Sequence, residues 1–154
     1  MILNRQRRIP LAVEALTTFC KRVQRELGFP EESVTICFVS DPAMVRMNRK
    51  FRDKPGPTDV LSFPVRRLKN RPKNRRARSL RSAGRIRAAQ YIGDIVISPE
   101  TARRYARRRS HGLVTELRVL ILHGMIHLAG YDHESDQGEM RHLERRLRRR
   151  LGLR

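Results

Sequence analysis

Three histidines stand at a fixed spacing near the end of the most apolar stretch of the sequence. His123, His127 and His133 follow the pattern His-x3-His-x5-His. On a helix the first two lie one turn apart on the same face, so their imidazoles can share one metal ion. Gly130 tolerates the left-handed conformation in which helices often end, so the chain can bring His133 back over the other two. Three histidines leave a fourth coordination position open, which is typical of a catalytic metal site.

The ligand chemistry indicates a transition metal. Neutral imidazole suits zinc, and also nickel or copper, so we expect one zinc-type ion per chain. Burying two unpaired imidazoles in an apolar helix would be costly, which favours metal binding over simple packing. His111 and His142 have no such partners, and we interpret them as surface or packing residues. Met140 could lie beneath the metal, but a core methionine is the simpler interpretation.

The residue after the first histidine separates this pattern from a known class of protease. Metzincin proteases share the histidine and glycine spacing but place a glutamate directly after the first histidine. Here that position is Gly124. Because the glutamate is the general base of those proteases, its absence argues against peptidase chemistry. We also expect Gly124 to leave room beside the metal for a bulky substrate.

The net charge of the chain indicates which class of partner it attracts. The 154 residues include 35 Lys and Arg against 15 Asp and Glu, a net charge of +20, which attracts polyanions. No apolar run approaches the roughly 20 residues that a membrane span needs. No signal-peptide core follows the basic N-terminal residues, so we expect a cytoplasmic protein with no membrane partner.

The densest basic run is an expected loop insertion at about residues 66–90. It holds 11 Lys or Arg and no acid, without apolar periodicity, so we expect it to be flexible and to contact a polyanion such as nucleic acid. The candidate residues for this contact are Arg66, Arg67, Lys69, Arg71, Lys73, Arg75, Arg76 and Arg78.

Hydrophobic periodicity and turn signals predict the elements that position the histidines. We expect strands over residues 1–6, 34–39, 60–65 and 91–97, and helices over 10–27, 41–52, from Ser98-Pro99 onward, 113–129 and 135–151. Asp41 and Ser98 each precede a proline and are expected N-caps. The order predicts one α+β domain over residues 1–154, with a small mixed sheet of about four strands packed with helices. The metal site would lie at the end of the long core helix.

Three sequence blocks carry a family resemblance. The stretch from His123 to His133, read as His-Gly-x-x-His-x-x-Gly-Tyr-Asp-His, resembles the signature of the YbeY family, bacterial endoribonucleases also called rRNA maturation factors. Two further blocks agree, Phe51-Arg52-Asp53-Lys54 with Pro57-Thr58-Asp59-Val60-Leu61-Ser62-Phe63-Pro64, and Gly93-Asp94-Ile95-Val96-Ile97-Ser98. The match spans nearly the whole chain in the family's order. The chain departs from the family pattern at residues 66–90. This segment is longer and more basic than we expect for the loop at that place.

The resemblance implies a function and a set of site residues. It implies a zinc-type site at His123, His127 and His133, a functional arginine at Arg52, and single-strand-specific RNA cleavage in ribosomal RNA processing and ribosome assembly. The partners would be ribosomal RNA, the small ribosomal subunit and its assembly factors. Arg52 and His123 are then the expected catalytic residues, because a guanidinium can bind two phosphate oxygens as charge develops on them.

Several points stay open in the sequence. No general base is obvious, and Asp132 could either orient an imidazole or cap the turn after Gly130. The main alternative to an endoribonuclease is a non-catalytic RNA-binding ribosome-assembly factor whose metal is structural. A metallopeptidase is a third hypothesis, supported only by the shared histidine spacing.

Overall fold

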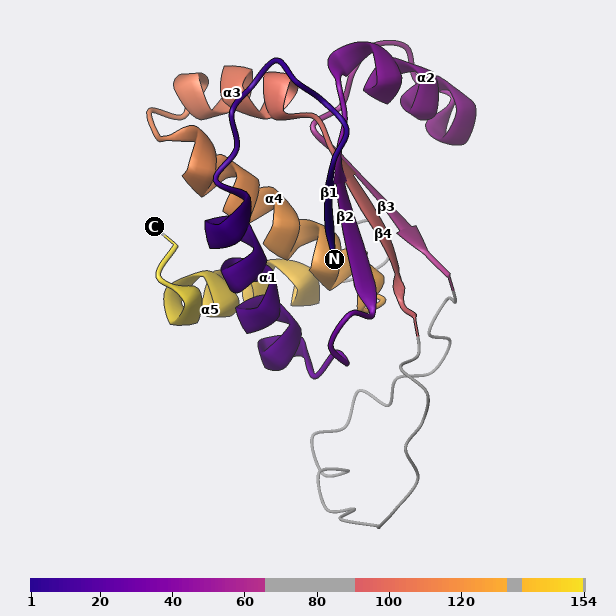
Figure 1. Ribbon diagram of the computed structural model, residues 1–154. Coiled ribbons are helices and arrows are strands. Elements are labelled where there is room, and N and C mark those ends of the chain that lie inside the picture. Colours follow the sequence, from indigo (N-terminus) through magenta and orange to yellow (C-terminus); the bar gives the residue numbers. More distant parts are fainter. Residues whose placement is uncertain (66–90, 133–136, 154) are drawn as a thin grey trace, which may run out of the picture.

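A four-stranded mixed sheet forms the centre of the protein (Figure 1). The computed structural model describes residues 1–65, 91–132 and 137–153. The strands are β1 (Ile2–Asn4), β2 (Val34–Phe38), β3 (Val60–Pro64) and β4 (Gly93–Ile97), in the spatial order β1-β2-β4-β3. Strands β1, β2 and β4 are parallel, and β3 runs antiparallel to β4 at one edge.

Helices cover both faces of this sheet. They are α1 (Val13–Leu27), α2 (Asp41–Arg52), α3 (Pro99–Arg108), α4 (Leu113–Leu128) and α5 (Glu139–Leu151). In Figure 1, α1, α4 and α5 gather on one side of the sheet, and α2 lies on the other. None of the helices in the described part of the chain has the length and apolar character needed to cross a membrane.

The alternation of side chains along β4 divides the core between the two faces. Ile95 and Ile97 are fully buried in the larger cluster with α1, α4 and α5, whereas Val96 packs with Met44 of α2 in a smaller cluster. This is the period-two pattern of a strand covered on both faces. The buried hydrophobic residues of helix α4, among them Leu117, Ile121 and Met125, are at most 6% exposed, so this helix is the centre of the larger cluster.

The predicted fold class is confirmed, with corrections at helix starts. The first helix begins at Val13, not residue 10, because Val13 N donates to Leu11 O in a tight turn before it. The last helix begins at Glu139 after Gly138, which has φ 97°, whereas residues 133–136 lie outside the described part. The N-cap of α2 is Ser40, not Asp41 as expected.

Asp41 instead joins the starts of α2 and α3. Its carboxylate accepts hydrogen bonds from Ser98 Oγ, from Thr101 Oγ1 at 2.7 Å and from Arg104 at 2.7 Å. Glu100 reciprocates by accepting from the Asp41 backbone N–H at 2.6 Å. Burial raises the pKa of Asp41, but these hydrogen bonds outweigh it and leave the pKa below its ordinary value. The predicted N-cap at Ser98 is confirmed by its bond from Thr101 N.

Candidate metal and RNA site

Two of the three predicted ligands converge on one face of α4. His123 Nε2 and His127 Nε2 lie 3.1 Å apart, and the two rings meet edge to face at 81°. This is the outcome expected for histidines one helical turn apart. The pair lies in the last turns of α4, at the end of the core helix where the sequence predicted it.

Each imidazole is oriented through its other nitrogen. His123 Nδ1 lies 3.3 Å from Glu144 Oε2 of α5, and His127 Nδ1 lies 2.9 Å from the Tyr131 carbonyl oxygen. An ionised carboxylate and a carbonyl can only accept, so the Nδ1 atom of each ring carries the proton and donates. In the neutral rings, the two Nε2 atoms then direct lone pairs at the same point.

Glu144 is itself held by Arg148 one turn further along α5. Arg148 donates to Glu144 Oε1 from Nε at 3.1 Å and from a terminal nitrogen at 2.7 Å. Burial raises the pKa of Glu144, but the hydrogen bonds from His123 and Arg148 outweigh it and lower the pKa from 4.5 to about 2. Glu144 is therefore a carboxylate at neutral pH and a permanent acceptor for His123.

The geometry of the pair fits a shared metal ion. Two nitrogens at about 2.0–2.1 Å from one tetrahedral ion lie about 3.3 Å apart, close to the spacing seen here. Unprotonated nitrogens this close repel unless a cation or a proton lies between them. Hydrogen-bonded Nδ1 atoms are also the usual support of metal-binding histidines. His133 lies outside the described residues, and among the residues described no group of three or more candidate ligands is arranged to hold a metal.

The glycine turn after α4 behaves as predicted. Gly130 adopts φ 93°, and the N–H groups of Gly130 and Tyr131 bond back to the last turn of the helix. The same turn brings the Tyr131 carbonyl against His127, so it also orients a predicted ligand. Asp132 follows in an exposed position, and both of its expected roles stay predictions.

Gly124 does not leave room for substrate, which corrects the sequence interpretation. It is buried, and a Cβ added there would lie 2.9 Å from one Ile95 methyl carbon and 3.1 Å from Ser62 Oγ. The glycine instead lets α4 approach the sheet closely, and Ser62 Oγ donates to its carbonyl at 3.4 Å. The space expected beside Gly124 is filled by side chains of β3 and β4.

The remaining predicted residues occupy other parts of the fold. Arg52 is the exposed last residue of α2, and within the described residues its guanidinium has no hydrogen-bond or ion-pair partner. The neighbouring Phe51 ring packs against Phe63 of β3, with centroids 5.0 Å apart. Residues 66–90, with all eight candidate RNA-binding residues, lie outside the described part, between strands that are hydrogen-bonded neighbours.

The other singled-out side chains are structural. Met140 is fully buried, as expected for a core methionine. His111 is a packing residue, bonded through Nε2 to the fully buried Glu116, whose other oxygen accepts from Arg109 at 2.7 Å.

Sequence reasoning missed Glu144, although a signal for it existed. The buried stripe of α5 is formed by Met140, Glu144, Leu147 and Leu151, at the three- and four-residue spacing of a helix face. A lone acid within an apolar stripe requires a buried partner. Its partners are His123 on a different helix and Arg148 one turn further along α5.

Comparison with known proteins places this chain in a family. A family model described as Endoribonuclease YbeY matches residues 1–152. Proteins named Endoribonuclease YbeY from Koribacter versatilis and Solibacter usitatus are each 37% identical, over 99% and 96% of this chain and 86% of each relative. The protein of that name from Geobacter metallireducens is 33% identical over 96% of this chain and 89% of its own length.

A solved structure shares the fold. The solution structure of TM1509 from Thermotoga maritima covers 98% of this chain and 89% of its own, with a TM-score of 0.59 and 23% identity. The family model spans almost the whole chain, and the relatives exceed 30% identity along nearly all of it. The chain belongs to the YbeY family.

Proposed function

We propose that this protein is a metal-dependent endoribonuclease that cleaves single-stranded RNA in ribosomal RNA processing and ribosome assembly. The observation that carries the proposal is the pair of oriented imidazoles with Nε2 atoms 3.1 Å apart, in a chain that matches the endoribonuclease family over residues 1–152. The expected partners are ribosomal RNA, the small ribosomal subunit and assembly factors in the cytoplasm.

One zinc-type ion would be held by His123, His127 and His133. Glu144 and the Tyr131 carbonyl keep the protons on Nδ1, so the Nε2 lone pairs remain available to the ion. When bound, such an ion polarises a phosphoryl oxygen and lowers the pKa of water.

Arg52 would supply the second positive group. Its exposed guanidinium can bind two oxygens of one phosphate and stabilise the charge that develops there. Strand β3 connects Arg52 to the histidines, because Phe63 contacts the end of α2 and Ser62 contacts α4. Since β3 is an edge strand, groups from both faces of the sheet can reach one RNA strand passing over this edge.

The buried position of Gly124 supports RNA cleavage over peptide cleavage. A metzincin protease needs a glutamate at this position as general base. Even a methyl group there would contact Ile95 at 2.9 Å, so this fold has no space for that side chain.

A cleavage assay with matched variants tests the proposal. We expect His123→Ala and Arg52→Ala to abolish cleavage of a labelled single-stranded RNA, because they remove a metal ligand and the phosphate-binding group. His142→Ala and Arg49→Ala should cleave like the parent, because both side chains are exposed on α5 and α2. Equal cleavage by all four variants would refute the proposed site. RNA binding without turnover under any metal would instead support the assembly-factor alternative.

A further inference from the structure

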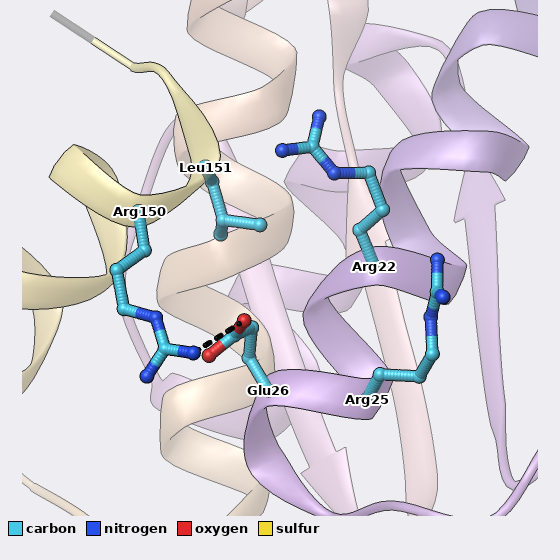
Figure 2. A pocket seen from close by; sticks show the side chains of 5 residues that line it. All are labelled: Arg22, Arg25, Glu26, Arg150 and Leu151. Carbon is cyan, nitrogen blue, oxygen red and sulfur yellow. Dashed lines mark ion pairs between the residues drawn. The ribbon is translucent and has the colours of Figure 1, made fainter.

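A basic pocket lies between α1 and α5, apart from the histidine pair (Figure 2). Its volume is about 240 Å³. The lining residues are Arg22, Arg25 and Glu26 of α1, with Arg150 and Leu151 of α5. Three guanidinium groups against one carboxylate give the pocket a net charge of +2. Neither Arg52 nor the histidine pair lines it.

The internal ion pair leaves two of the three arginines available. Arg150 reaches across to Glu26 at 3.1 Å, as the dashed line in Figure 2 shows. Arg22 stands one turn before Glu26 on α1, yet in the described part of the chain neither Arg22 nor Arg25 has an ion-pair partner. Both are exposed and lie three residues apart, on one face of the helix.

This arrangement costs stability unless an anion is present. Like charges three residues apart on a helix repel by a few tenths of a kcal/mol. Glu26 does not relieve the repulsion, because its carboxylate is engaged by Arg150. An anion that enters the pocket meets two guanidinium groups, each able to form paired hydrogen bonds with phosphate oxygens.

We propose that this pocket binds a backbone phosphate of the RNA strand and anchors it beside the cleavage site. The proposal rests on the proposed function for the identity of the ligand. Helix α5 connects the two sites, because Glu144 contacts His123 and Arg150 lines the pocket. These two residues are six positions apart, a rise of about 9 Å along the helix axis.

Two variants test the pocket, because one is expected to weaken RNA binding and the other to strengthen it. Binding of a short labelled single-stranded RNA would be measured by fluorescence anisotropy at several salt concentrations. The double variant Arg22→Gln/Arg25→Gln should reduce the slope of log K against log salt by about 0.7, because both arginines contact the one phosphate in the pocket. At 0.1 M salt this corresponds to about fivefold weaker binding. Glu26→Gln should tighten binding, by up to about fivefold where the released Arg150 contacts a second phosphate.

Matched controls separate a pocket from general surface charge. Arg103→Gln/Arg107→Gln removes the same charge from exposed positions of α3, and Glu31→Gln removes an exposed acid outside the pocket. We expect the slope of each control to stay near the parent value. If each pocket variant and its control shift affinity and slope equally, RNA responds only to net charge and the pocket proposal is wrong.

The assay also separates this proposal from the proposed function. Weaker binding by the double variant than by its control supports the pocket even when the parent shows no cleavage. Conversely, if His123→Ala abolishes cleavage but the pocket variants bind RNA like the parent, the function stands and the pocket proposal fails.

Discussion

Replacing Gly124 with alanine places a methyl group where α4 already touches the sheet. The added carbon would lie 2.9 and 3.0 Å from two methyl carbons of Ile95 and 3.1 Å from Ser62 Oγ. Unstrained carbon contacts are about 3.5–4.0 Å. Helix α4 must therefore move away from β4 by several tenths of an ångström, or Ile95 must leave its preferred rotamer. Either movement disturbs the helix that carries His123 and His127.

The expected cost follows from two opposing contributions. Overpacking a buried contact lowers the free energy of unfolding by about 1–3 kcal/mol. Replacing a glycine in a helix interior by alanine raises it by about 0.5–1 kcal/mol. The Gly124→Ala variant should therefore lose about 1–2 kcal/mol of unfolding free energy. For a domain of this size each kcal/mol corresponds to about 2–4 °C, so the Tm should fall by about 2–8 °C.

A double-mutant cycle identifies the contact responsible. Ile95→Val removes Cδ1, one of the crowding carbons, at a cost of about 0.5–1.5 kcal/mol by itself. Thermal and urea unfolding should show that the double variant is less destabilised than the sum of the single variants, because the shortened side chain relieves the contact at 3.0 Å, although Cγ2 at 2.9 Å remains. A Gly124→Ala variant as stable as the parent would refute the reasoning that this glycine lies at a packing limit, whereas strict additivity in the cycle would show only that Cδ1 is not the carbon responsible.

Three further perturbations test other parts of the structure. Glu144→Gln should weaken metal binding by about 10–100-fold in a competition assay with a chelator dye, because His123 loses its anionic acceptor; unchanged affinity would contradict this role. Asp41→Asn should lower the free energy of unfolding by about 1–2 kcal/mol at pH 7, because it weakens the hydrogen bonds that this carboxylate accepts. Because the folded-state pKa of Asp41 lies below the ordinary 3.8, its contribution is present above that pH and lost as pH falls through the folded-state pKa. The difference in unfolding free energy between Asp41→Asn and the parent, measured by urea unfolding, should therefore shrink on acidification. A difference that stays constant would show that the ionised carboxylate is not what stabilises the fold. Replacing residues 66–90 with an Asn-Gly turn between the neighbouring strands should weaken RNA binding and flatten its salt dependence, whereas an unchanged slope would show that the segment makes no phosphate contact.

Local patterns were sufficient to predict the elements and the convergence of His123 and His127 on one helix face. The spacing of His123 and His127 determines that they share a helix face, and helix geometry then brings their Nε2 atoms together. Gly130 was correctly placed at the end of that helix because a left-handed residue is a local requirement. The strands were predicted to within about three residues, since each is a short apolar run bounded by turn residues.

Features that depend on contacts between distant segments were not predicted. The role of Gly124 was misread because the side chains that crowd it, Ile95 and Ser62, belong to strands far away in the sequence. Asp41 was expected to cap its own helix, but its partners belong to α3, which begins more than fifty residues later. Glu144 was missed for the same reason, because His123 is 21 residues away on another helix.

The most direct test of a metal-dependent site is elemental analysis of the purified protein and of four single variants. We predict about one zinc-type ion per chain in the parent, and loss of that ion in His123→Ala, His127→Ala and His133→Ala. His142→Ala serves as the matched control, because His142 is exposed on α5, and it should retain the ion. A folded parent that holds no metal after reconstitution, or histidine variants that keep the full amount, would contradict the three-histidine site.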